Sequence, residues 1–549
     1  MTTSASSVAH GGEDSGRHAD RVHPNDSATP KWSATAWLLP AVLGAGAVLA
    51  FGHFLFTGDV AGAQVAVALA LTAAPLLLVA IESPGRLLHP LSVFAFTMLL
   101  GIAGQTIYLN YIAEDMDKTE LLSGLPTATL TSGLLVVGVA VLGLVLGYLL
   151  ASRPGFVKPG PILGRAVELG LARSSPRRVF WAVSALCLIS LAAFALYVPQ
   201  VASDPSQSLL TSEKRFVDIE GGQTVFGYYR WLISLTGTGF VLAVYTIVQN
   251  RRPWRSALGL VALVSLLLTI LTSTYTSSRI VVASVLATAA FVAIALRQRE
   301  PSAAKIVAAG AIAIVALSVL FGLRVVNQDD ASSFGETFNV QSVVRQAIGS
   351  RDWMDIGPLS AVVERVPDAY DYRYGGTLAS ALIAPVPRTL WPDKPQVRLG
   401  PLIGPSVYKF STDRRSGDPP GIVGELWING GIIGVITGSL IFGLLLRRVG
   451  RWYQLSPATG GLSALVYGVF VVALSLRLAV GDVTGTFLAL LLDVPTLLVL
   501  LWLTKTRGAT RTGESRPAQH SIGRGQRPAA SGHLTRTPSA PPSGPLSVR

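Results

Sequence analysis

The sequence predicts an all-α integral membrane protein with about twelve transmembrane helices, and three observations support this fold class. Half of the residues are hydrophobic, 14% are charged, and the mean hydropathy is +0.51, which leaves too little polar surface for a soluble protein of 549 residues. The apolar residues gather in segments about as long as a bilayer is thick. The basic residues lie mainly in every second connection between these segments.

Twelve apolar segments are predicted to cross the membrane. Each is close to the roughly 17 to 25 residues that a helix needs to cross about 30 Å of hydrocarbon. The segments are 34–56, 60–81, 88–112, 127–151, 179–201, 226–248, 256–274, 280–296, 304–323, 428–446, 458–479 and 483–503. An even number of spans places both termini on the same side of the membrane.

Two tails and one long loop complete the predicted organisation. Residues 1–33 and 504–549 are rich in small and polar residues and lack apolar periodicity, so we expect two disordered tails. The first nine helices occupy 34–323 and the last three occupy 428–503. The large loop between helices 9 and 10 is 324–427.

Three short helices are expected in the large loop. Glu336–Ile348 and Pro358–Val366 have apolar residues at helical spacing, and Gly375–Ala384 is apolar up to Pro385 and Pro387, which forbid its continuation. We expect these helices to lie on the membrane surface or to cap the bundle as a lid.

The orientation follows from the Lys and Arg residues. With the N-terminus inside, the cytoplasmic segments carry 27 of them, whereas the short external loops together carry only four: Lys118, Lys214, Arg215 and Arg279. Basic residues are retained on the cytoplasmic side, and long loops are left out of the count because they cross largely regardless of charge. Both termini are therefore predicted inside, and the large loop outside.

Several function classes are disfavoured by composition. The net charge of +13 is explained mostly by these topology determinants, so we expect no nucleic acid as a partner. The single cysteine, Cys187, excludes an intrachain disulfide. None of the seven histidines lies in the large loop, so we expect no metal there, and no pattern suggests a cofactor.

The stretch from Ala384 to Gly434 is the most plausible place for chemistry. It contains eight prolines, two tryptophans, four carboxylates and six basic residues, and it leads directly into an apolar span. A long polar loop stiffened by proline is more often functional than a short connection is. The alternative is a solvated external loop without chemistry.

The residues of this stretch resemble a known family. The string PRTLWPDKP at 387–395, followed by GDPPGIVGELWINGGIIG at 417–434, resembles the oligosaccharide repeat-unit polymerases of the Wzy-type O-antigen polymerase family. A TSSR string at 276–279 adds to the resemblance, which is strongest over Arg373–Leu446. It implies a glycosyltransferase of the bacterial cytoplasmic membrane that joins polyprenyl-pyrophosphate-linked oligosaccharides, with a chain-length regulator as a further partner.

The same resemblance implies roles for particular residues. Arg279 and Arg388 would contact the donor pyrophosphate, and Lys394 would add positive charge near the leaving group. Glu425 is the first choice for the general base that deprotonates the acceptor hydroxyl, and Asp393 is the second. The alternative for Glu425 is a carboxylate that interacts with the dipole at a helix N-terminus.

Four arginines stand where the charge rule does not place them. Arg230, Arg279, Arg324 and Arg477 lie near the outer ends of predicted spans. A charge at the centre of a membrane helix costs roughly 2.5 to 3.5 kcal/mol on insertion, and less near the interface. We expect the four to converge on an anionic site such as a lipid pyrophosphate. The alternative is snorkelling to headgroups or pairing with neighbours such as Asp482.

Three further features can be explained by structural roles: a tryptophan, a carboxylate within a span and a group of glycines. Trp391 offers an aromatic face to a sugar ring, or it anchors the chain at the membrane interface. Asp493, in the middle of the last span, is expected to be structural and to pair with a hydroxyl or an arginine. The glycines Gly430, Gly431 and Gly434 are expected to allow close helix packing.

Other functions remain open at this point. An O-antigen-ligase-like glycan transferase would have a similar layout, but such ligases rely on a loop histidine that this sequence lacks. A transporter or flippase of lipid-linked sugars is the alternative from another class, although no internal repeat stands out and the long loop is not central. A structural membrane scaffold is the least specific alternative.

The predicted topology can be tested with cysteine substitutions in a Cys187→Ser background. Because of the charge asymmetry, positions 411 and 414 should react with an impermeant thiol reagent on intact cells, whereas positions 252 and 448 should not. Labelling at 448 but not at 411 would reverse the orientation.

Overall fold

The computed structural model describes residues 34–82, 89–152, 174–201, 223–275, 279–297, 302, 305, 308–310, 348, 354–386, 390–391, 393–409, 419–454 and 461–506. Across these residues the secondary structure is helical apart from one isolated antiparallel bridge, between Ser174 and Lys505. Eleven helices within them are long and apolar enough to cross a membrane. The predicted fold class, an all-α multipass membrane protein, is confirmed.

The membrane-crossing helices coincide with eleven of the twelve predicted segments. They are α1 (Ala34–Thr57), α2 (Val60–Glu82), α3 (Pro90–Met98) with its continuation to Ile112, α6 (Leu130–Leu150), α8 (Pro176–Val201), α11 (Gln223–Gln249), α12 (Ala257–Tyr275), α13 (Arg279–Arg297), α20 (Gly421–Gln454), α22 (Gly461–Val472) with its continuation to Val480, and α24 (Val483–Thr504). The predicted span 304–323 lies almost wholly outside the described residues.

Two of the spans contain π-helical segments. After α3 the chain continues through Leu99–Gly104 (η1), the short helix α4 (Gln105–Ile107) and Tyr108–Ile112 (η2). In the same way, Ala473–Arg477 (η5) joins α22 to α23 (Leu478–Val480). Segments of this kind widen a helix locally and often occur at functional sites.

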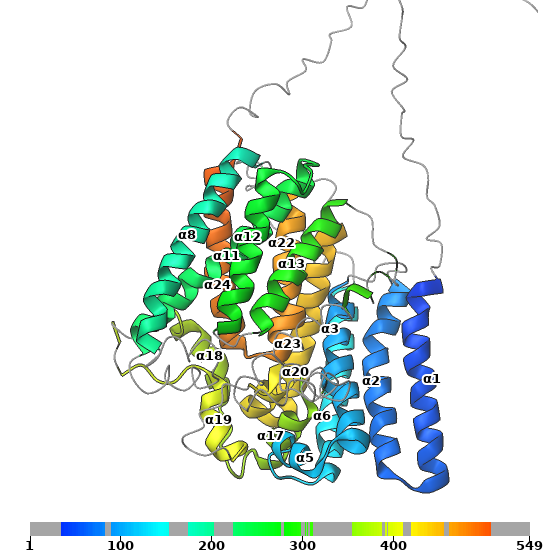
Figure 1. Ribbon diagram of the computed structural model, residues 1–549. Coiled ribbons are helices and arrows are strands. Elements are labelled where there is room, and N and C mark those ends of the chain that lie inside the picture. Colours follow the sequence, from blue (N-terminus) through cyan, green and yellow to red (C-terminus); the bar gives the residue numbers. More distant parts are fainter. Residues whose placement is uncertain are drawn as a thin grey trace, which may run out of the picture. The chain divides into compact units, whose positions relative to one another are not determined.

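The buried apolar residues form two main clusters. The first lies between α2, α3, α6 and α20, and the second lies between α8, α11, α12, α13, α22 and α24. Figure 1 shows these two groups of helices, with α1, α2 and α3 in blue on one side and α8, α11 and α12 in green on the other. A smaller cluster around Phe291, Val449 and Tyr467 joins the groups through α13, α20 and α22.

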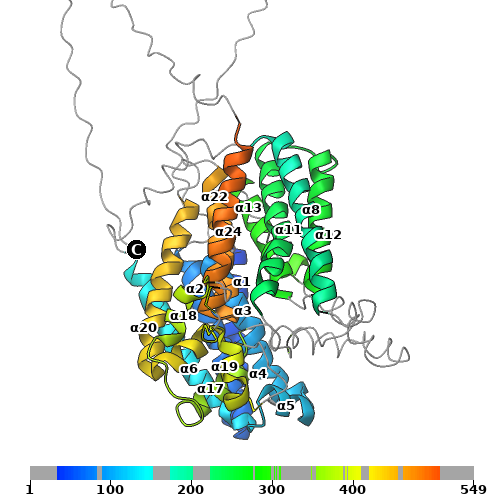
Figure 2. The same cartoon turned by 90° about the vertical axis from the view of Figure 1, so that its left-hand side faces the viewer.

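Arg451 on α20 and Arg178 on α8 mark one end of the bundle, which we call the basic end. There Arg451 donates a hydrogen bond to the carbonyl oxygen of Ala151, and Arg178 donates one to that of Lys505. The helices of the large loop, α17 (Ile356–Arg365), α18 (Gly376–Ile383) and α19 (Leu399–Val407), lie at the opposite end, the loop end (Figures 1 and 2). The assignment of the basic end to the cytoplasmic side stays a prediction.

The loop helices differ in part from their prediction. α17 and α18 occur where two short helices are predicted, whereas α19 and α5 (Asp115–Leu121) are not predicted. The predicted helix Glu336–Ile348 lies outside the described residues except for Ile348. Far from resting on the surface, α17 is buried from Ile356 through Val362 and packs against α6, where a Cβ on Gly133 would collide with Ser360.

Helix α20 is a hairpin rather than one straight helix. Its backbone leaves helical geometry at Gly430 and Gly431, and Gly431 has a φ of 56°, in the left-handed region that favours glycine. A Cβ on Gly438 would collide with the side chain of Leu426. In a continuous helix these two residues would be about 18 Å apart along the axis, so the segment Gly421–Asn429 folds back along the start of the span.

This segment, which we call the half-helix, corrects two predictions. The span predicted to start at 428 starts after the break, and the residues before it return toward the bundle interior instead of remaining in the loop. Of the three glycines predicted for close packing, Gly434 fits, because a Cβ there would collide with the carbonyl oxygen of Leu426. Gly430 and Gly431 form the turn instead.

Glycines also set the contact between α6 and the main part of α20. On α6, a Cβ on Gly143 would lie 3.1 Å from the Cβ of Ser439, and one on Gly147 would collide with the backbone of Leu440. On α20, a Cβ on Gly443 would collide with the backbone of Leu144. Small residues four positions apart on both helices allow this close approach, as is common between membrane helices.

Gly147→Ala should therefore destabilise the protein, because the added methyl group meets the backbone of α20, which cannot move aside as a flexible side chain can. We expect a loss of about 1 to 3 kcal/mol, typical of an overpacked core. The matched control is Gly138→Ala on the same helix, whose Cβ would lie 3.7 Å from the nearest atom, in Leu71. Equal thermal unfolding temperatures of the two purified variants in detergent would contradict the prediction.

Candidate active site at the loop end

Glu425 is held at the loop end by three elements that are distant in sequence. It lies on the half-helix with its side chain fully buried (0% exposed). Oε1 accepts a hydrogen bond from the hydroxyl of Thr377 on α18 (2.8 Å), and Oε2 accepts one from the backbone N–H of Val483, the first residue of α24 (2.7 Å). One carboxylate thus joins the half-helix, α18 and α24.

These contacts match the alternative predicted for Glu425 more closely than they match an open general base. The N–H groups of the first helical turn lack partners within the helix and favour a negative charge. The carboxylate caps the N-terminus of α24, however, and not that of its own helix. Both of its oxygen atoms are engaged, and the side chain is closed to solvent.

Asn429 extends this network by one helical turn. Its Nδ2 donates to the hydroxyl of Thr377 (2.6 Å) and to the carbonyl oxygen of Glu425 (2.8 Å), while its Oδ1 accepts from the backbone N–H of Gly375 (3.0 Å). Gly375 precedes α18 with a φ of 87°, which glycine adopts readily. Asn429 lies in the string at 417–434 and Gly375 lies outside it, so this link joins the string to the start of α18.

A second carboxylate lies next to Glu425. Asp482 is the N-cap of α24 and accepts hydrogen bonds from the backbone N–H groups of Gly485 and of Leu399, the first residue of α19. The guanidinium of Arg398 lies against the same turn, because its Nη1 would be 3.2 Å from a Cβ placed on Gly485. Arg398 is exposed. It thus brings positive charge to the rim of this otherwise closed network.

Lys394 points into the protein, and its ammonium is engaged with backbone carbonyl groups. Its ammonium is buried and donates to the carbonyl oxygens of Ala384 (2.7 Å) and Val386 (2.9 Å). These carbonyl groups follow the end of α18, where the last carbonyls of a helix lack intrahelical partners. The positive charge of Lys394 therefore caps α18 and is not presented at the surface.

Two other predicted residues of the same string are open to solvent. Asp393 and Trp391 are both exposed, and the turn in which the N–H of Lys394 bonds to the carbonyl oxygen of Trp391 holds them together. Arg388, three residues earlier than Trp391, lies outside the described residues. An open carboxylate beside an open indole is an arrangement that can meet a sugar.

The four arginines predicted to converge have different surroundings. Arg477, in η5, forms an ion pair with Asp493 on α24, with 3.2 Å between Nη1 and Oδ2. This is the internal pairing considered as the alternative, and Arg477 is an arginine partner of the kind expected for Asp493. Arg230 is exposed on α11. Arg279 begins α13, but its side chain and the whole of Arg324 lie outside the description.

Arg365 is a structural arginine that the sequence analysis did not single out. It is buried at the end of α17 and donates to the carbonyl oxygens of Val407, at the end of α19, and of Ser123 (2.9 Å), before α6. Burial lowers the pKa of Arg365 from its usual value. These bonds fasten α17 and α19 to the bundle and so support the helices that carry the site.

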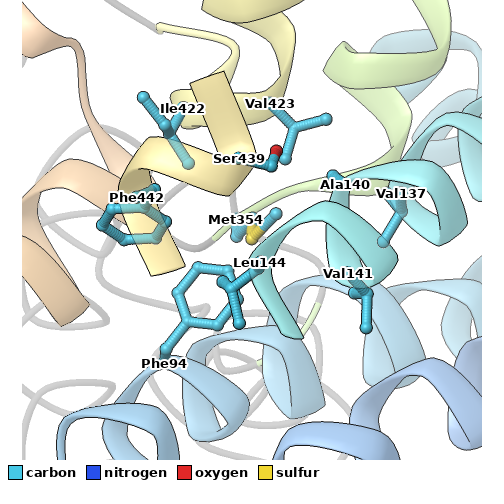
Figure 3. Close-up of a pocket in the computed structure, with 10 residues that line it drawn as sticks. All are labelled: Phe94, Val137, Ala140, Val141, Leu144, Met354, Ile422, Val423, Ser439 and Phe442. Atoms are coloured by element: carbon cyan, nitrogen blue, oxygen red, sulfur yellow. The ribbon is translucent and has the colours of Figure 1, made fainter. Parts of the chain in front are cut away.

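A small pocket lies beside the half-helix, between it, α3, α6 and the main part of α20 (Figure 3). Ser439 provides the one hydroxyl in a lining that is otherwise apolar, made up of Phe94, Val137, Ala140, Val141, Leu144, Met354, Ile422, Val423 and Phe442. A pyrophosphate would lose its hydration there without gaining charged partners. The exposed guanidinium of Arg398 suits such a group better.

Comparison with known proteins adds no assignment to this geometry. No protein-family model, no curated protein and no solved structure matches the chain.

The hydrogen bonds of Glu425 to Thr377 and Val483 predict that Glu425→Gln is less destabilising than Glu425→Leu. Glu425→Gln can still accept from Val483 and donate to the Thr377 hydroxyl, so it should cost about 1 kcal/mol of stability. Glu425→Leu leaves both donors buried and unpaired, at about 1 to 3 kcal/mol each. The control is Glu364→Leu, at an exposed position on α17. If Glu425→Leu unfolded at the same temperature as the control, the carboxylate would not be a structural tie.

Proposed function

We propose that the chain polymerises polyprenyl-pyrophosphate-linked oligosaccharide repeat units at the outer face of a bacterial cytoplasmic membrane. The observation that carries the proposal is where the stretch resembling this family lies in the structure. Its described part builds one polar site at the loop end, opposite the basic end. A lipid-linked substrate would present its pyrophosphate at the membrane boundary, where this site lies in the proposed topology.

The proposed reaction is a glycosyl transfer. A hydroxyl of the acceptor repeat unit attacks the anomeric carbon of the donor glycan, the bond from that carbon to the pyrophosphate oxygen breaks, and the polyprenyl pyrophosphate leaves. Arg279 and Arg388 are proposed to stabilise the charge that develops on the leaving group. Their planar guanidinium groups can bind two phosphate oxygens at once.

The contacts within the site divide its residues into two groups. Glu425 and Lys394 are engaged with backbone groups and with Thr377, so in this proposal they position α18, α20 and α24. Asp393 has the accessibility that a general base needs, and it replaces Glu425 as the first choice for that role. Trp391 is proposed to offer its ring to a sugar, and Arg398 to add charge at the rim.

A deletion strain of the source organism tests the function directly. Loss of a polymerase should leave single repeat units on the lipid carrier and on the cell surface. Long chains that remain on the carrier would indicate a ligase, and repeat units trapped on the cytoplasmic side would indicate a flippase. Either of these two results would overturn the proposal.

The arginine roles give a second test, by complementation of that strain. Arg279→Ala and Arg388→Ala should each sharply reduce polymer at normal protein level, and the corresponding Lys variants should rescue poorly, because an ammonium cannot form the bidentate contact. Arg448→Ala, at the basic end, is the matched control and should retain polymer. Near-normal polymer in both Lys variants would show that these arginines act only as membrane-interface charges.

Asp393→Asn distinguishes a general-base role of Asp393 from a purely structural one. The amide keeps the size of the side chain and cannot accept a proton, so turnover should fall while thermal stability stays unchanged at this exposed position. Polymer of normal length from Asp393→Asn would remove Asp393 from the mechanism.

A further inference from the structure

Helix α18 contains no charged residue and presents leucine side chains at the surface of the protein. Thr377 and Ala381 are buried, whereas Leu378 and Leu382, which follow them and are four residues apart on an adjacent side, are 38% and 75% exposed. An exposed leucine pair on a short helix needs a covering, because apolar side chains are costly to leave in water.

Two more apolar side chains are held beside the end of α18. Lys394 donates to the carbonyl oxygens of Ala384 and Val386, which brings the segment carrying Leu390 and Trp391 to the helix C-terminus. Leu390 is 78% exposed and Trp391 is 40% exposed. We call Leu378, Leu382, Leu390 and Trp391 the α18 apolar face.

The α18 apolar face adjoins a surface that faces lipid. α18 packs beside the start of α24, where the hydroxyl of Thr484 donates to the carbonyl oxygen of Thr377 (3.2 Å). From Phe487 and Leu491 onward, α24 carries a stripe of exposed apolar residues along a membrane-spanning helix. The exposed apolar surface of the spans therefore continues past the N-terminal end of α24 and onto α18 in the loop.

We propose that α18 is an interfacial helix whose apolar face lies in the lipid leaflet at the loop end. Tryptophan is typical of the boundary between hydrocarbon and headgroups, so Trp391 lies at the edge of this face, where its indole can still meet a sugar on the water side. The end of α18 is also satisfied from within the protein, by the ammonium of Lys394, as backbone groups near hydrocarbon must be.

A second copy of the chain is a weaker occupant. A standard protein interface buries roughly 800 Å² on each partner, and four side chains on and beside an eight-residue helix offer much less. The exposed Asp393 interrupts the face where such an interface would have to extend. At a headgroup boundary the same carboxylate can stay hydrated, because its end remains in water.

Nitroxide labels on single cysteines can test the proposal in a Cys187→Ser background. The full chain is reconstituted in vesicles of phosphatidylethanolamine and phosphatidylglycerol, and collisions of the label with oxygen and with a water-soluble nickel chelate are measured. Labels at Leu378→Cys and Leu382→Cys should favour oxygen, as should the lipid-facing control, a label at Leu491→Cys on α24. A label at Asp371→Cys, an exposed loop position, is the aqueous control and should favour nickel.

Each other outcome would overturn the proposal. Nickel-favoured collisions at 378 and 382 would place α18 in water, and low collision rates with both reagents would indicate a protein contact such as a second copy. Leu382 is 75% exposed, so Leu382→Cys removes little packing from α18 and tests the proposal alone if Leu378→Cys perturbs the fold. The measurement needs no activity, so its result stands whether or not the chain is a polymerase.

Discussion

The buried carboxylate of Glu425 is the constraint on which the loop end depends. A carboxylate removed from water must be supplied with hydrogen bonds, and here they come from α18 and from the first N–H of α24. Satisfying it requires the half-helix to fold back, which in turn requires the turn at Gly430 and Gly431. The position of three helices thus follows from one side chain.

Hydropathy and charge predicted the bundle, because a bilayer requires long apolar helices and retains basic residues on one side. The same logic could not predict the hairpin in α20. The residues before 428 read as the end of the polar loop, and only backbone geometry shows that Gly421–Asn429 form a half-helix that folds back along the span. The short helix α19 was missed because Pro401 and Pro405 suggest a loop, yet its first turns pack against α17 through Leu399 and Ile403.

The sequence predicted where the candidate site lies, but not which of its residues are buried in contacts and which are exposed. The spacing of Glu425 and Asn429, four residues apart, indicates that they share one side of a helix. Nothing in the sequence indicates that Thr377, about fifty positions earlier, lies between them, nor that Lys394 would turn inward to cap α18. Exposure depends on tertiary contacts, and it distinguishes Asp393 from Glu425, which composition does not.

The contact between Glu425 and Val483 also has a consequence for biogenesis. The two residues are 58 positions apart, so the half-helix leaves the ribosome well before the helix whose N-terminus it caps. Until α24 is inserted, the carboxylate lacks that partner and is better solvated by water than by the bilayer. The full set of hydrogen bonds to Glu425 can therefore form only after α24 has been inserted.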